Sequence, residues 1–159
     1  MKRIVTHSYS DVTRLKQEYE AMLLRLICRS RRSGVPIEPY GRQGGITRIY
    51  DELAHAGLYG CLLLAGFGEK TAAIHISIPD YTAGLLPKAI RELVTHCSPQ
   101  AHYAVAGILP EDTSRMMFAQ VRQELAKHGA VIREVNRQSE YSVVVIDPRE
   151  GKLHVFKRA

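Results

Sequence analysis

The sequence lacks the features of disulfide-rich, secreted and membrane-spanning proteins. Its 159 residues include no tryptophan and only three cysteines, Cys28, Cys61 and Cys97. Because this odd number has no CxxC spacing, we interpret all three as buried structural thiols in a reducing compartment. No apolar run approaches the roughly 18 residues that cross a membrane, and the first residues lack the apolar core of a secretory signal. We therefore expect a cytoplasmic protein without membrane association.

Recognisable catalytic and metal-binding motifs are also missing. The seven histidines form no HExxH or HxH motif and no pair four residues apart, so we expect no metal site. The glycines match neither a Walker A loop nor GxGxxG. No Gly-x-Ser-x-Gly elbow is present, and spacing alone identifies no pairing of a cysteine with a histidine. These absences predict no cofactor and leave open whether the protein is an enzyme.

What the chain does have is an uneven positive charge. Its net charge is +6, with 22 Lys and Arg against 16 Asp and Glu. The stretch from Arg25 to Arg48 holds six arginines and one acid, Glu38. Such a cluster favours phosphate-rich or acidic partners, and an ordinary solvated loop is the alternative. The candidate binding residues are Arg29, Arg31, Arg32, Arg42 and Arg48.

Hydrophobic spacing predicts a single α/β domain arranged around residues 60–81. There, two apolar strands over 61–65 and 71–78 flank a polar turn. On the second strand we expect the isoleucines to face the core, and His75 and Ser77 to share the other face. The other expected strands cover 2–6, 102–109, 130–135, 141–146 and 153–156, and the expected helices cover 10–31, 46–56, 87–98 and 110–128.

This element order, β-α-α-β-β-α-β-α-β-β, implies a mixed sheet flanked by helices on both faces. Residues 33–45, which contain two prolines and four glycines, are expected to form a long loop that is either functional or an ordinary connector.

The same order resembles the topology of GNAT-type N-acyltransferases. Residues 78–81, followed by 86–90, resemble the strand–loop–helix step at which that family binds the pyrophosphate of CoA, and residues 109–112 look similar. Where the family carries Arg/Gln-x-x-Gly-x-Gly/Ala, this chain has TAGLLP over 82–87. The resemblance implies an acyl-CoA-dependent acyltransferase, with CoA as cofactor. Backbone N–H groups would hold its phosphates in an anion or cofactor loop that comprises Tyr81, Thr82, Gly84 and Lys88.

A second, shorter resemblance lies on the strand at 71–78. The run His75-Ile76-Ser77-Ile78 resembles one copy of the His-apolar-Ser/Thr-apolar element of 2H phosphoesterases, in which two such strands supply an acid and a base. A second copy is not present, because His102 is followed two residues later by Ala104. A half-buried strand histidine is the alternative interpretation of His75.

The sequence alone therefore favours a small basic binding module that engages nucleic acid or another acidic partner. The acyltransferase is the alternative, a 2H-like phosphoesterase is a more remote one, and a structural or interaction protein is a third. Under the preferred hypothesis, replacing Arg31 and Arg32 with Ala weakens nucleic-acid binding and flattens its salt dependence, because fewer counterions are released. Fluorescence anisotropy at several salt concentrations measures both effects, and an intact protein that binds no nucleic acid at low salt would contradict the hypothesis.

Overall fold

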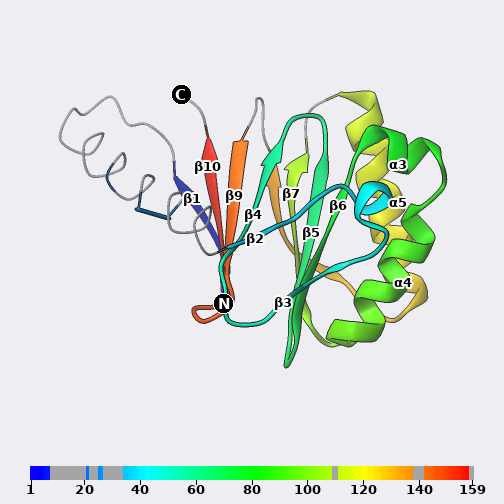
Figure 1. Cartoon of the computed structure of the whole chain (residues 1–159). Helices are drawn as coiled ribbons and strands as arrows, with labels where there is room; N and C mark the ends of the chain where they lie inside the picture. Colours follow the sequence, from blue (N-terminus) through cyan, green and yellow to red (C-terminus); the bar gives the residue numbers. More distant parts are fainter. Residues whose placement is uncertain (8–20, 22–24, 27–33, 109–110, 138–141, 158–159) are drawn as a thin grey trace.

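In the described part of the chain, ten strands form two five-stranded sheets packed face to face, and helices cover the outer face of one of them (Figure 1). The structure is a computed structural model of the whole chain. It describes residues 1–7, 21, 25–26, 34–108, 111–137 and 142–157. The α/β class predicted from the sequence is confirmed.

Both sheets are mixed. The first sheet has the order β1-β10-β9-β4-β2, in which β1 runs parallel to β10 and β2 parallel to β4. The second sheet has the order β3-β6-β5-β7-β8, in which only β7 and β8 are parallel. The strands are β1 (Ile4–His7), β2 (Val35–Pro36), β3 (Thr47–Ile49), β4 (Ala54–Leu58), β5 (Leu62–Phe67), β6 (Thr71–Ile76), β7 (His102–Ile108), β8 (Ile132–Arg137), β9 (Ser142–Asp147) and β10 (Lys152–Lys157).

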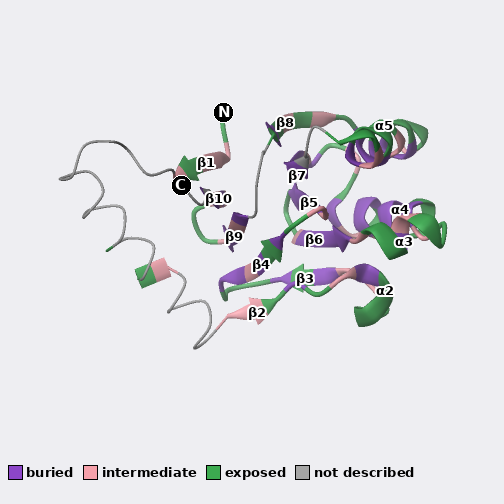
Figure 2. Ribbon diagram, turned by 90° about the horizontal axis from the view of Figure 1, so that it is seen from above, coloured by how far each residue is buried: buried purple, intermediate pink, exposed green. Residues whose placement is uncertain are grey.

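The helices lie on the side of the second sheet that faces away from the first (Figures 1 and 2). They are α2 (Tyr40–Gln43), α3 (Ile78–Thr82), α4 (Leu86–Cys97) and α5 (Asp112–Lys127). The buried positions of α4 recur at three and four residues, which places one apolar stripe on the sheet and leaves its polar face in solvent. These positions are Leu86, Ala89, Ile90, Leu93, Val94 and Cys97.

Strand β5 lies at the centre of the molecule, because both of its faces are covered. All six of its residues are buried. Leu62 and Leu64 pack with α4 and α5 in one core cluster, whereas Leu63 and Ala65 pack between the two sheets in another. The continuous apolar run predicted a strand covered on both faces, and the structure confirms it.

The helix predicted over residues 46–56 is wrong. This stretch contains β3 and the start of β4 instead. The apolar residues that suggested a helical stripe do not share a face, since Ile49 is 3% exposed and Tyr50 is 70% exposed. The burial instead alternates along both strands, and this period of two is the pattern of a half-buried strand.

The expected single sheet is also corrected, because the strands divide between two. The expected loop over 33–45 contains, from residue 34 onward, the short elements β2 and α2. Most of the helix predicted over 10–31 lies outside the described residues. Arg25 and Leu26 from that segment are helical, and Leu26 packs against Val145 and Phe156 of the first sheet and against Leu53, which precedes β4.

Glu134 on β8 joins the edges of the two sheets. Its carboxylate accepts hydrogen bonds from the backbone N–H groups of Arg3, at 2.8 and 3.0 Å, and of Ile4, at 3.2 Å, and also contacts His102 Nε2 at 2.5 Å. Burial acts to raise the pKa of Glu134, but these hydrogen bonds outweigh it and hold the pKa below its ordinary value. The ionised carboxylate is therefore the form that fastens β1, in the first sheet, to the second sheet.

We predict that Glu134→Gln lowers the free energy of unfolding at neutral pH by about 1–3 kcal/mol, because an amide cannot accept all of these hydrogen bonds. Since folding lowers the pKa of Glu134, its contribution is complete above the ordinary pKa of glutamate and is lost as the pH falls through the folded-state value. Urea unfolding across acidic pH measures both effects. Glu69→Gln, at an exposed turn, is the control, and equal losses for the two variants would contradict the prediction.

Candidate functional site

The chain crosses from the first sheet to the second through the three residues between β4 and β5. Gly60 adopts a φ of 68° in this link, a left-handed conformation that favours glycine. Tyr59 is 75% exposed. On β7, Gly107 has a φ of 91°, and a Cβ there would collide with the carbonyl oxygen of Cys61. Two glycines thus allow a tight crossing that ends at Cys61, on the rim between the sheets.

Cys61 carries a partly exposed thiol beside the inter-sheet core. The side chain packs against the cluster between the sheets, and Sγ donates to the carbonyl oxygen of Tyr59 at 3.6 Å. Burial and, less strongly, the carboxylate of Asp80 raise the pKa of the thiol, against the opposite effect of the bond to Tyr59. Cys61 is therefore protonated at rest and needs a base to become a nucleophile.

His75 lies on β6 with a fixed ring and one unused nitrogen. The residue is 6% exposed, and Nδ1 lies 3.0 Å from the carbonyl oxygen of Ile37. A carbonyl can only accept, so Nδ1 carries the proton and Nε2 of the neutral ring bears a lone pair. Nε2 is buried and has no hydrogen-bond partner among the described residues. A buried orphan nitrogen of this kind costs about 1–3 kcal/mol and calls for an explanation.

The strand register places Cys61 and His75 on the same face. Leu63 pairs with His75 in the antiparallel ladder of β5 and β6. Cys61 precedes Leu63 by two residues, and side chains two residues apart in an extended chain point the same way. Cys61 is therefore a diagonal neighbour of His75, a relation in which Cβ atoms lie about 7–8 Å apart or less. The register therefore places a thiol and an imidazole, fourteen positions apart in the sequence, at diagonal positions on one face of the sheet.

A capping box fixes the end of β6 next to this pair. The Ser77 hydroxyl accepts from the N–H of Asp80, and the Asp80 carboxylate accepts from the N–H of Ser77, so helix α3 begins immediately after the strand. Asp80 also accepts from the N–H of Gly41 on α2 at 3.0 Å. These bonds tie α2 and α3 together and hold the backbone beyond His75.

The predicted arginine cluster is described only in part. Arg29, Arg31 and Arg32 lie outside the described residues. Arg42, at the end of α2, is exposed and lies 3.8 Å from Glu38 in an ion pair. Arg48, on β3, is exposed and lines a cavity to which Arg42 does not contribute.

The predicted anion loop has few free donors. Tyr81 packs against the core, the Thr82 hydroxyl donates to a carbonyl of its own helix, and the N–H of Gly84 donates to Tyr81. Lys88 is exposed on the first turn of α4, where Pro87 removes one further donor. CoA binding in this loop stays a prediction that these occupied groups do not favour.

Comparisons with known proteins add no family. No protein-family model matches the chain, and no curated protein matches it significantly. Within the described residues, no helix is long and apolar enough to cross a membrane, and no three His, Cys, Asp or Glu residues are arranged to hold a metal ion.

Sequence reasoning missed the pairing of Cys61 with His75, although the signal was present. As expected, the isoleucines and His75 lie on opposite faces of β6, but the first sheet covers the face of His75, so Ala73 and His75 are as buried as Ile74 and Ile76. With a tight turn between two antiparallel strands, opposite residues have a constant sum of residue numbers. This rule pairs Leu63 with His75, and it therefore places Cys61, two residues before Leu63, diagonally next to His75.

We predict that Cys61 is alkylated much faster than Cys97. Thiolates are the reactive species, and burial raises the pKa of Cys97 to about 11, while its side chain is only 2% exposed. Timed iodoacetamide labelling with mass spectrometry of the peptides measures both rates in one sample. The native protein at neutral pH should carry the label at Cys61 while Cys97 remains unmodified, and comparable labelling of the two would contradict this site.

Proposed function

We propose that Cys61 and His75 form a nucleophile–base pair that performs acyl transfer, most simply hydrolysis of an amide or ester. The observation that carries the proposal is the buried, unpartnered Nε2 of His75, on the same face as a partly exposed thiol. A cysteine activated by an imidazole, which a third group orients, is the general design of thiol nucleophiles. Here the orienting group is the carbonyl oxygen of Ile37.

The reaction begins when Nε2 of His75 removes the proton from Sγ of Cys61. At rest the thiol donates to Tyr59, so a rotation about the Cα–Cβ bond of Cys61 must precede this transfer. Sulfur then attacks the carbonyl carbon, and the protonated His75 returns its proton to the leaving amine or alcohol. The result is a thioester on Cys61, which water hydrolyses with His75 again acting as base.

The backbone beside Cys61 offers groups that stabilise the charge on the attacked carbonyl. In the described part of the chain, neither the N–H of Gly60 nor that of Cys61 donates to another backbone group. Free N–H groups beside a nucleophile are common donors to a developing oxyanion. Beside them, Tyr59 and Ile78 are 75% and 43% exposed, and the side chain of Ile78 lies against Gly60. An apolar rim of this kind favours a substrate presented on the surface of another molecule.

Binding of nucleic acid or another acidic partner remains a second proposal. The charge asymmetry that motivated it is a property of the sequence, and Arg48 supports it as an exposed arginine without an ion pair among the described residues. The two proposals use different parts of the molecule and are independent.

A chromogenic ester tests the acyl-transfer proposal. With p-nitrophenyl acetate, the wild-type protein should release p-nitrophenol in an initial burst of about one equivalent and carry an acetyl group on Cys61, detected by mass spectrometry. Cys61→Ser should remove the burst. His75→Gln should slow it by about 10²–10⁴-fold, because the base is lost while the thiol stays.

His96→Gln is the matched control, since His96 also has a buried Nε2 without a partner among the described residues but lies in α4, away from Cys61. Circular dichroism confirms that each variant is folded. If His75→Gln folds and acylates at the wild-type rate, or if Cys61→Ser retains the burst, the proposal is wrong.

A further inference from the structure

A second site lies at the opposite end of β5 from Cys61. A cavity of about 850 Å³ opens between the start of β3, the turn that joins β5 to β6, and the last turns of α4. Among the residues that line it are Arg48, Lys70, Arg91, Glu92 and His96. Cys61 immediately precedes β5 and Lys70 follows it, so the length of a six-residue strand, about 20 Å, separates this cavity from the thiol.

The cations of this cavity have no partners in the described part of the chain. None of Arg48, Lys70 and Arg91 forms an ion pair there or donates a side-chain hydrogen bond, in contrast to Arg115 and Lys127, which pair with carboxylates on their own helix. Three positive groups that line one cavity without ion-pair partners repel one another. An anion placed between them would remove that repulsion.

His96 lies close enough to the cations of the cavity for their charge to lower its pKa. Its pKa lies below the ordinary value, first because of burial and then because of the charges of Arg48 and Lys70. Its Nε2 is buried and has no hydrogen-bond partner among the described residues. An imidazole nitrogen at this place can donate to a bound anion when it carries a proton.

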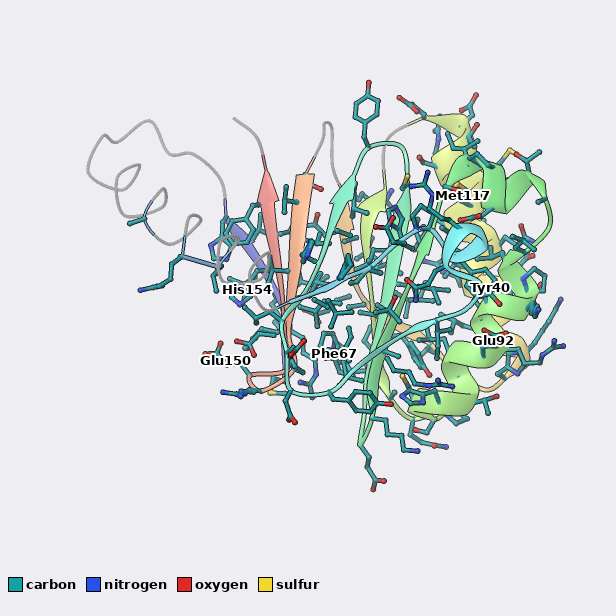
Figure 3. All side chains as sticks on the ribbon, in the orientation of Figure 1. Tyr40, Phe67, Glu92, Met117, Glu150 and His154 are labelled. Atoms are coloured by element: carbon teal, nitrogen blue, oxygen red, sulfur yellow. The ribbon has the colours of Figure 1, made fainter. Side chains whose placement is uncertain are left out.

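Glu92 is the one carboxylate among the described residues that line the cavity. Glu92 neighbours Tyr40 of α2 (Figure 3), and after burial its proximity is the next cause that raises the pKa of Tyr40 to about 12. Glu92 makes no ion pair with the three cations among the described residues. Arg48, Lys70 and Arg91 outnumber this carboxylate, so the lining of the cavity is positive overall.

We propose that this cavity binds a small molecule that carries phosphate groups. Arg48, Lys70 and Arg91 neutralise the phosphates, because charge-assisted hydrogen bonds from arginine and lysine are the strongest that proteins offer to such anions. The volume lies within the range of small-molecule sites, about 300–1,000 Å³. A concave cavity suits a small ligand better than the extended stripe of charge that follows a nucleic-acid backbone. The site goes beyond the acyl-transfer proposal and does not depend on it.

Isothermal titration calorimetry with inorganic pyrophosphate at low salt tests the proposal. We expect saturable binding to the wild-type protein and a loss of about tenfold in affinity for each of Arg48→Ala and Lys70→Ala. Arg133→Ala removes an exposed charge from β8, outside the cavity, and should leave the affinity unchanged. Because Arg48 and Lys70 are exposed, these substitutions leave the core intact, and thermal melts verify this.

Two results would overturn the proposal. The first is that pyrophosphate fails to bind the wild-type protein at about 10 mM, or that it binds the wild type, Arg48→Ala and Arg133→Ala equally. The second concerns a single-stranded oligonucleotide. If Arg48→Ala weakens its binding but pyrophosphate does not displace it from the wild-type protein, the surface belongs to nucleic acid instead. Displacement of the oligonucleotide by pyrophosphate, with both sensitive to Lys70→Ala, supports the phosphate site.

Discussion

The packing of one sheet on the other through small side chains is the constraint on which the rest of the structure depends. The cluster between the sheets contains six alanines, at positions 54, 56, 65, 73, 104 and 106. Small residues on facing sheets leave little room for larger groups, since protein interiors are packed to the density of organic crystals. His75 lies on the face of β6 that this layer covers, opposite Leu63, and it is only 6% exposed. The same packing that stabilises the fold therefore deprives Nε2 of water, and so defines the candidate catalytic group.

The pairing of the sheets also explains why the two glycines of the crossing matter. A chain that leaves one sheet at Leu58 and enters the other at Leu62 has only three residues in which to turn. Gly60 supplies the left-handed conformation, and Gly107 supplies the space next to the carbonyl of Cys61. At another edge, Glu134 joins β8 to the N–H groups that precede and begin β1. The crossing therefore places Cys61 at the rim between the sheets, whereas Glu134 fastens the sheets near the opposite end of β5, where His102 pairs with Phe67.

Where the periodicity of the sequence was unambiguous, it predicted the elements. The amphipathic stripe of α4, the acidic start of α5 and the apolar run of β5 identify their elements, because each pattern has one structural solution. The pattern of residues 46–56 is compatible with two structures. Ile46, Ile49 and Leu53 fit a helix, whereas Thr47 and Ile49 fit a strand, and only tertiary packing decides between them. The division of the strands into two sheets depends on long-range pairing such as that of β9 with β4, which leaves no local signal. The candidate site could not be identified for the same reason, because only the pairing of β5 with β6 places Cys61 and His75 on one face.

The two proposed sites constrain each other through β5 and β6. Both strands run from the thiol end of the molecule to the phosphate cavity, with Cys61 and Ser77 at one end and Lys70 in the turn at the other. A small ligand cannot reach from one site to the other across about 20 Å of buried strand. Under the two proposals together, the phosphate ligand is therefore not the group that Cys61 attacks. It would influence the thiol only through the strands themselves, whose core is too tightly packed to deform gradually. Nε2 of His75 then lacks a partner because it acts on Cys61 when a substrate approaches from the rim at Tyr59.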